Sequence, residues 1–325
     1  SLLGAEDGEL AATATSPGEE MPMVSQHPGW AEQHPDMWWT HLVTATQQAM
    51  DRSGLKPERI RAIGITYQMH GLVAVDEAQQ VIRPSIIWCD SRAASIGDEA
   101  FQALGSSYYL KHLLNSPGNF TASKLRWVQE NEPELYRRIH KIMLPGDYIA
   151  MKMTGRISTT ITGLSEGIFW DYSSGEPSSR LLDHFQISDS LLPEYHASLE
   201  PSGALTRKAA EELGLNAGTP VSYRAGDQPN NAFSLNVLNP GEIAANAGTS
   251  GVLYGVTHHA AFDEQSRVNT FIHVTHRREQ PAYGVLLCLN GTGILNSWLR
   301  RLMGRDRLPE YKEMNTMAAG VPIGS

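Results

Sequence analysis

The sequence predicts an α/β protein with two domains, and three observations support this prediction. The chain has 325 residues, of which 41% are hydrophobic and 19% charged, which suits about two ordinary globular domains. Strand-like apolar runs alternate with stretches of helical periodicity along much of the chain. A new series of strand-like runs begins after Pro240-Gly241, so we place a domain boundary there, between residues 1–240 and 241–325.

The first 54 residues predict a hairpin strand followed by a long helix. The opening "SLLGAEDGELAATATS" predicts the second arm of a hairpin around "EDGE" whose first arm is absent, and with Ser1 in place of Met we expect that further sequence precedes it. In "HPDMWWTHLVTATQQAMDRSG", Trp38, Leu42 and Ala49 recur at helical spacing. We therefore expect an amphipathic helix that ends near Gly54.

The middle of the chain predicts buried strands, then helices, then loops. "IRAIGITYQ" and "PSIIWCD" are typical of strands, and "GLVAVDEAQQVIR" between them predicts a hairpin around Glu77. Helical patterns dominate residues 95–140, and "HKIMLPGDYIAMKMTG" predicts a strand that turns at Pro145-Gly146 into a helix. Residues 156–205 are rich in Ser, Thr, Gly and Pro, which favours loops and short helices.

Strand patterns resume at "TPVSYRAGDQPNNAFSLNVLNPG", where a strand is expected to lead into a helix. "EIAANAGTSGVLYGV" predicts two strands joined by a tight turn. "VNTFIHVTH" and "AYGVLLCLN" predict two more strands, and "GILNSWLRRLMG" predicts a helix. These elements open the second domain.

Charge and cysteine content narrow the possible functions. The net charge of −9 and the pI near 5.7, without a basic run, argue against nucleic acid as a partner. No stretch of about 18 apolar residues predicts a membrane span, so we expect no membrane association. Cys89 and Cys288 lie in apolar runs and are expected to be buried thiols, as in a cytoplasmic protein.

The stretch "YRAGDQPNNAF" places Asp227 at a strand-to-helix junction, where an acid has two possible roles. It can cap the helix that Pro229 is expected to open, because a carboxylate accepts the N–H groups of a first helical turn. It can instead act as a general base. The residues of this stretch alone favour the capping role, which is common in α/β proteins.

The turn formed by Gly248, Thr249, Ser250 and Gly251 can present backbone N–H groups and two hydroxyls to a phosphate. An ordinary β-turn uses the same residues, and no Gly-Lys-Ser/Thr follows at the spacing of a Walker A loop. Its position about twenty residues after Asp227 is more informative. An acid and a hydroxyl-rich turn on opposite sides of a cleft are the parts needed to transfer a phosphoryl group to an alcohol.

Two further segments carry candidate substrate contacts. "ITYQMHGLV" places Gln68, Met69 and His70 between two strands, where their polar atoms can reach sugar hydroxyls; a structural histidine is the alternative. "WCDSR" contributes Asp90 and Arg92, which can contact a ligand or form a plain ion pair with each other.

Other chemistries have little support. The histidines of residues 258–276 lack a zinc-protease spacing or an accompanying cysteine pair, so no metal-ligating side chain can be named. No Gly-x-Ser-x-Gly motif indicates a serine nucleophile.

Five blocks, taken in order, resemble the FGGY carbohydrate kinases of the actin/hexokinase superfamily. They are "GWAEQHPDMWW", "GITYQMHGLVAVDEAQQVIRPSIIWCDSRA", "SKLRWVQENEPELYRRIHKIMLPGDYIAMKMTG", "AGDQPNNA" and "NAGTSGVLYGV", and they span most of residues 29–256. The resemblance implies an actin/hexokinase-like two-domain ATPase fold with an incomplete second domain. It also implies that residues 1–240 hold the sugar and that residues 241–325 begin the nucleotide-binding domain.

The resemblance implies a role for each candidate residue. Asp227 would be the catalytic base, Met69 and His70 would contact the sugar with Gln68 and Gln228, and the Gly248–Gly251 turn would hold phosphate. "QMHG" resembles family members that act on D-xylulose, whereas "GDQ" is more typical of those that act on glycerol. The N-terminal phosphate hairpin and the C-terminal adenosine segment of the family have no counterpart in this chain.

The expected activity is therefore phosphorylation of a ketopentose, D-xylulose first, by ATP with Mg²⁺. A kinase for ribulose or glycerol and a sugar-binding pseudokinase are the alternatives. A homodimer is a possible partner arrangement.

Overall fold

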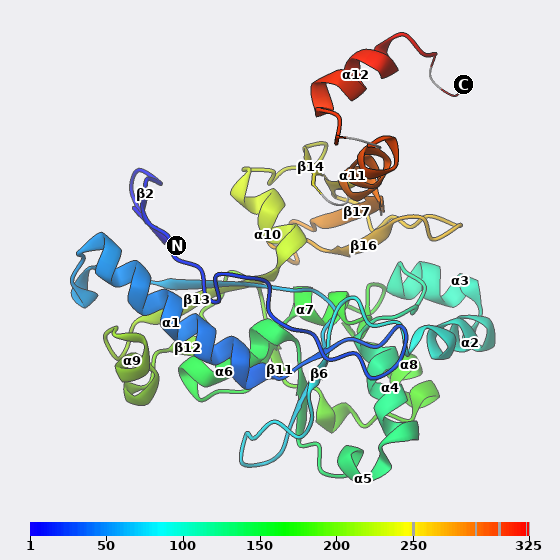
Figure 1. Ribbon diagram of the computed structural model, residues 1–325. Coiled ribbons are helices and arrows are strands. Elements are labelled where there is room, and N and C mark those ends of the chain that lie inside the picture. The colour runs from blue at the N-terminus through cyan, green and yellow to red at the C-terminus, as the bar shows by residue number, and fades with distance from the viewer. Residues whose placement is uncertain (249–250, 290, 305–306, 323, 325) are drawn as a thin grey trace.

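Short strands and helices alternate along the chain, as the sequence predicts (Figure 1). The computed structural model describes residues 1–248, 251–289, 291–304, 307–322 and 324. The α-helices are α1 (Pro35–Ser53), α2 (Ala94–Leu104), α3 (Ser106–Tyr108), α4 (Thr121–Asn131), α5 (Pro133–Tyr136), α6 (Pro145–Thr154), α7 (Ile161–Glu166), α8 (Ser179–Phe185), α9 (Arg207–Leu213), α10 (Asp227–Ser234), α11 (Thr292–Met303) and α12 (Tyr311–Ala319). The tighter or wider helical turns are η1 (Pro57–Arg59), η2 (Tyr109–Leu113) and η3 (Asp189–Leu191).

The strands are mostly short and form several small sheets. They are β1 (Leu2–Leu3), β2 (Leu10–Ala12), β3 (Glu32–Gln33), β4 (Ile63–Tyr67), β5 (Val73–Val75), β6 (Ser85–Ile86), β7 (Lys141–Met143), β8 (Ser158–Thr160), β9 (Trp170–Asp171), β10 (Glu176–Pro177), β11 (Glu194–His196), β12 (Gly203–Ala204), β13 (Pro220–Gly226), β14 (Ile243–Ala247), β15 (Gly251–Thr257), β16 (Asn269–Ile272) and β17 (Tyr283–Leu289). The predicted strands at residues 63–67, 141–143 and 220–226 are confirmed.

Helix α1 shows how local sequence sets an element's ends. Pro35 occupies the first turn, where its missing N–H costs nothing, and the His34 side chain accepts a hydrogen bond from the Asp36 N–H. Gly54 ends the helix with φ of 64°, a left-handed conformation that glycine adopts readily. Ala49 of the predicted apolar series is buried, Trp38 and Leu42 are half-buried against the core, and the fully buried tryptophan is Trp39.

One sheet determines where the candidate site lies. Its strand order is β12-β13-β4, and β13 runs parallel to β4 with Gly226 opposite Tyr67. The carboxyl ends of these two parallel strands therefore lie side by side. The residues that follow each strand meet at this edge, which is where ligands bind in open α/β sheets.

The four-stranded antiparallel sheet β14-β15-β17-β16 confirms the strands predicted after residue 240. Tyr254, Phe271 and Leu286 on this sheet belong to the same hydrophobic core as Leu125 and Leu164 of the preceding region. Helix α10 contacts both β13 and β14 and lies where the two regions meet (Figure 1). The domain boundary near residue 240 stays a prediction.

Two details of the sequence analysis were wrong. Cys89 and Cys288 are exposed rather than buried. The strand expected at "PSIIWCD" spans only Ser85–Ile86, so Cys89 falls in the turn that follows, and Cys288 lies near the end of β17, where the sheet is uncovered. Apolar neighbours in sequence did not bury these thiols, because among the described residues no packed element covers either of them.

The hairpin predicted around Glu77 is confirmed in part. Val75 bridges Val81 across the turn, but the main partner of β5 is β7, which pairs with it in antiparallel register.

Across the described ranges, no helix combines the length and apolar character that a membrane crossing requires.

Candidate active site

Asp227 is the first residue of α10 and directly follows β13. Its Oδ1 accepts a hydrogen bond from the Gln228 backbone N–H, and its Oδ2 accepts one from the Gln228 side-chain amide, each at 2.9 Å. Burial raises the pKa of Asp227 above its ordinary value, while these hydrogen bonds from Gln228 oppose the rise. The carboxylate thus receives an N–H of the first helical turn, and a raised pKa also suits a general base.

Gly226 lets the two strand ends approach each other closely. A Cβ added there would lie 2.6 Å from Met69 Cγ and 2.9 Å from Glu166 Oε2, which are closer than such atoms pack. Met69 itself is buried. The glycine before Asp227 therefore allows the catalytic candidate to sit against the Met69 segment.

His70 is held by several contacts. Its backbone N–H donates to Glu166 Oε1 at 2.9 Å, and its carbonyl accepts from Lys124 Nζ at 2.8 Å. Its ring Nδ1 lies 3.1 Å from the Glu166 carbonyl oxygen. Burial, with the Lys124 ammonium nearby, lowers the pKa of His70 to about 3, so the ring is neutral at physiological pH.

Gln68 reaches toward the start of α1. Its Nε2 lies 3.4 Å from Gln33 Oε1, which also accepts a hydrogen bond from the Trp38 indole N–H at 3.0 Å. The fold thus brings Gln68, Met69 and His70 to the strand edge where Asp227 and Gln228 also lie.

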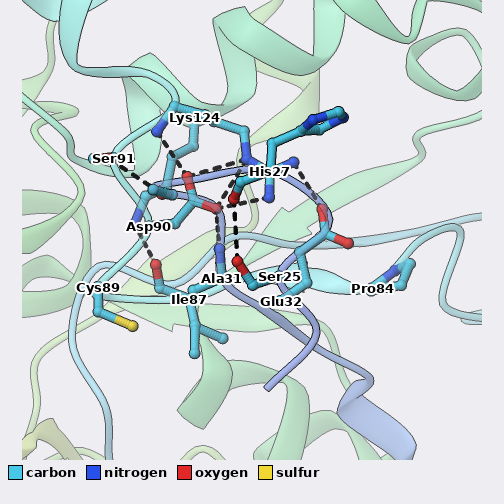
Figure 2. A network of polar contacts seen from close by, with 12 residues as sticks. Ser25, His27, Ala31, Glu32, Pro84, Ile87, Cys89, Asp90, Ser91 and Lys124 are labelled. Carbon is cyan, nitrogen blue, oxygen red and sulfur yellow. Dashed lines mark hydrogen bonds and ion pairs between the residues drawn. The ribbon is translucent and has the colours of Figure 1, made fainter.

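Asp90 and Arg92 form the ion pair that the sequence analysis gave as one of two possibilities. Arg92 Nη2 lies 2.6 Å from Asp90 Oδ2, and both side chains are almost completely buried. Asp90 Oδ2 also accepts the Ala31 N–H at 2.6 Å, within the network that Figure 2 shows. The Arg92 guanidinium lies 3.9 Å above the Trp30 ring. Direct contact of this pair with a ligand stays a prediction.

The structure describes the two end residues of the predicted phosphate turn, Gly248 and Gly251. Thr249 and Ser250 lie outside the described residues. The Gly248 carbonyl accepts the Gly293 N–H at 3.1 Å, and Gly251 begins β15 beside Thr292. Gly248 and Gly251 thus adjoin the N-terminus of α11, a position where helix N–H groups favour anions.

Two buried charged residues at this edge were missed by the sequence analysis, Glu166 and Lys124. Both are completely buried, and both contact His70. Glu166 ends a short helix in a stretch rich in small residues, and Lys124 lies on a helix that presents other charges to solvent. Neither had a local signal, because their burial arises from packing between distant segments.

Among the described residues, no three His, Cys, Asp or Glu side chains come together as a metal site. Mg²⁺ usually keeps several waters and takes one or two carboxylates together with substrate phosphates, so its binding with a nucleotide needs no such cluster.

Comparison with known proteins identifies the class. The description "FGGY family of carbohydrate kinases, N-terminal domain" matches residues 2–234. This chain therefore belongs to the FGGY family of carbohydrate kinases.

Particular members are similar over most of the chain. The xylulose kinase of Escherichia coli (strain K12) is 30% identical over 304 residues, which are 94% of this chain and 60% of that protein. The xylulose kinase of Streptomyces rubiginosus is 32% identical over 243 residues, 74% of this chain and 49% of the relative. The crystal structure of the xylulose kinase from Rhodospirillum rubrum has a TM-score of 0.85 and 28% identity, covering 93% of this chain and 61% of the other.

These similarities confirm the predicted actin/hexokinase-like α/β fold. The chain spans about 60% of the length of the E. coli relative.

Proposed function

We propose that this protein transfers the γ-phosphoryl group of ATP to the primary hydroxyl of a ketopentose, with D-xylulose as its main acceptor and D-xylulose 5-phosphate as the product. The observation that carries the proposal is the meeting of Asp227 with the Gln68–His70 segment at the carboxyl edge of β13 and β4. The xylulose kinases among its relatives support the choice of acceptor.

Asp227 is the proposed general base. Its carboxylate takes the proton of the sugar hydroxyl while that oxygen attacks the γ-phosphorus and the bond to the β-phosphate oxygen breaks, which releases ADP. A carboxylate of raised pKa is better matched to this proton transfer than an ordinary exposed aspartate. Gln228 orients it through two hydrogen bonds.

The Gln68–His70 segment is the proposed sugar contact. His70 is neutral, and donation from its Nδ1–H to the Glu166 carbonyl leaves Nε2 able to accept a hydrogen bond from a hydroxyl. Phosphoryl transfer depends mainly on the alignment of attacking and leaving groups, so fixed contacts of this kind contribute directly to rate.

The proposed phosphate contact is the turn that starts at Gly248 and ends at Gly251. Its neighbour, the N-terminus of α11, favours negative charge. Mg²⁺ would arrive bound to the phosphates of ATP and would neutralise part of their charge.

We also propose that the protein works in the cytoplasm and that it assembles as a homodimer. Light scattering after size-exclusion chromatography would test the assembly.

A coupled ADP-release assay on the protein encoded by the complete reading frame tests the proposal. With Mg-ATP, D-xylulose is expected to give the highest kcat/KM in a panel with ribulose and glycerol. A preference for glycerol or ribulose would reassign the acceptor on the same scaffold. No turnover with any ketose or polyol would refute the kinase assignment in favour of the pseudokinase.

A further inference from the structure

His70 has a backbone conformation that needs support. Its φ is 59°, in the left-handed region, which residues with a Cβ seldom occupy. Such a conformation persists where the surrounding structure fixes it, and it is concentrated at ligand sites. The contacts around His70 therefore determine how its side chain is presented.

Two buried ionisable side chains hold the two peptide groups of His70, and burial raises the pKa of one of them, Glu166, well above its usual range. Glu166 Oε1 accepts the His70 N–H at 2.9 Å, and Lys124 Nζ donates to the His70 carbonyl at 2.8 Å. Both side chains belong to fully buried residues, and the second Glu166 oxygen accepts a hydrogen bond from the Tyr67 hydroxyl at 3.2 Å. Burying a polar or ionisable group is costly unless it is hydrogen-bonded, and both side chains make their hydrogen bonds to the His70 segment and its neighbours.

The His70 ring is fixed as well. Its Nδ1 lies 3.1 Å from the Glu166 carbonyl oxygen, and a carbonyl can only accept, so Nδ1 carries the proton. The rings of Phe120 and Phe271 lie 4.5 and 5.6 Å from the His70 ring, measured between centroids. Backbone and ring are therefore held together, with one nitrogen left as an acceptor.

Lys124 also connects two segments of the site. Its Nζ donates to the Ile87 carbonyl at 2.9 Å, three residues before Asp90. Figure 2 shows Lys124 in one polar network with Ile87 and Asp90. A single ammonium thus ties the His70 segment to the segment that carries the buried Asp90–Arg92 pair.

We propose that Lys124 and Glu166 are positioning residues of the ketose site, which hold His70 in its left-handed conformation and so aim its ring at the sugar. This inference rests on the proposed function and refines it. Lys124 and Glu166 act through His70, so their loss should weaken sugar recognition far more than the phosphoryl-transfer step.

The first test compares Lys124→Met with a matched control, Lys141→Met. Lys141 Nζ also donates to two carbonyls, those of Ser190 and Leu192, at 2.7 and 2.9 Å, but it lies away from the strand edge. In the protein from the complete reading frame, Lys124→Met is expected to raise the KM for D-xylulose about 10- to 100-fold, the range for losing hydrogen bonds to a charged group. Its kcat and its KM for ATP should change less than about threefold. Lys141→Met should leave all three unchanged.

The second test uses rescue at Glu166. Glu166→Ala removes the acceptor of the His70 N–H and is expected to raise the KM for D-xylulose by about tenfold or more. Glu166→Gln keeps an amide oxygen for that N–H and an NH₂ group for the Tyr67 oxygen, so it should recover most of the loss. Equal KM values for the Ala and Gln variants would refute the positioning role of Glu166, and this pair decides the matter if Lys124→Met does not fold.

A third readout needs no substrate. Hydrogen–deuterium exchange of a peptide covering residues 66–72 should be about tenfold faster in Lys124→Met and Glu166→Ala than in the parent protein, and unchanged in Lys141→Met. If the parent phosphorylates no ketose, the proposed function fails, and the exchange rates still decide whether Lys124 and Glu166 hold His70. Unchanged exchange, or a KM for D-xylulose that Lys124→Met does not raise, would overturn the proposal.

Discussion

Two regions of the molecule differ in how their side chains are partnered. One is the carboxyl edge of strands β4 and β13, and the other is helix α11. At the strand edge, charged residues such as Glu166, Lys124 and Arg224 are completely buried and engage other protein groups. In α11 no residue is buried, and apolar side chains such as Trp298 and Leu302 are 54% and 60% exposed. One region is fixed by many mutual contacts, and the other is an amphipathic helix with an open apolar face.

This difference indicates where stability and specificity are concentrated. A buried charge that loses its partner leaves an uncompensated charge, so substitutions at the strand edge should be severe. A helix gains most of its stability from packing of its apolar face, and α11 has little packing of that kind among the described residues. The substitutions below test this contrast, from the largest expected effect to the smallest.

The largest effect on stability is expected from Arg224→Met. The Arg224 side chain is completely buried, and its Nε lies 2.9 Å from Asp147 Oδ1. Its loss would leave the Asp147 carboxylate buried without its cation, at a cost of about 3–5 kcal/mol of unfolding free energy. Urea denaturation measures this cost.

The double variant Arg224→Met/Asp147→Asn is the control for that measurement. The asparagine removes the unpaired charge and can still accept the Leu144 N–H that Asp147 Oδ2 accepts at 3.0 Å. It should recover much of the lost stability, because an ion pair replaced by neutral groups is often tolerated. A single variant as stable as the parent would contradict the view that this edge depends on paired charges.

A smaller effect is expected from His70→Ala. The substitution leaves a bound sugar hydroxyl without its partner, so the affinity for D-xylulose should fall by about 1–3 kcal/mol, measured by calorimetric titration. ATP hydrolysis in the absence of sugar should change much less. An equal loss of both would mean that His70 supports the fold rather than the substrate.

The smallest effect is expected from Trp298→Ser on α11. An exposed side chain without a packed neighbourhood contributes little, so the unfolding free energy should change by less than about 0.5 kcal/mol. Thermal or urea unfolding of the 325-residue chain measures it. A loss above about 2 kcal/mol would show that α11 is packed far better than its exposure indicates.

Local sequence predicted many of the elements and gave the candidate site residues, because the signals for both are short-range. The spacing of Trp38 and Leu42 and the glycine at position 54 were enough for α1. The strand-to-helix junction at Asp227 and the polar residues after β4 were likewise visible in single segments. Parallel pairing of β4 with β13 then brought these two segments together.

What the sequence could not predict depends on contacts between distant segments. Lys124 and Glu166 meet His70 from 54 and 96 residues away, so no local pattern marks either as part of the site. The predicted burial of Cys89 and Cys288 was wrong for the same reason, since apolar neighbours in sequence do not show whether another element covers a residue. The partners of a buried charge are fixed by tertiary packing.

The central claim is that Asp227 removes the proton from the sugar hydroxyl, and Asp227→Asn tests it most directly. Asparagine is nearly isosteric and keeps an oxygen for the Gln228 N–H, so α10 should still begin at the same residue. In the protein from the complete reading frame, kcat with D-xylulose and Mg-ATP is expected to fall about 10²- to 10⁴-fold, while the Kd for D-xylulose changes less than about threefold. Asp263→Asn, at an ion pair with the exposed Arg267, should leave kcat unchanged. An Asp227→Asn variant that binds D-xylulose and turns over at nearly the parent rate would contradict the account and leave Asp227 with a capping role alone.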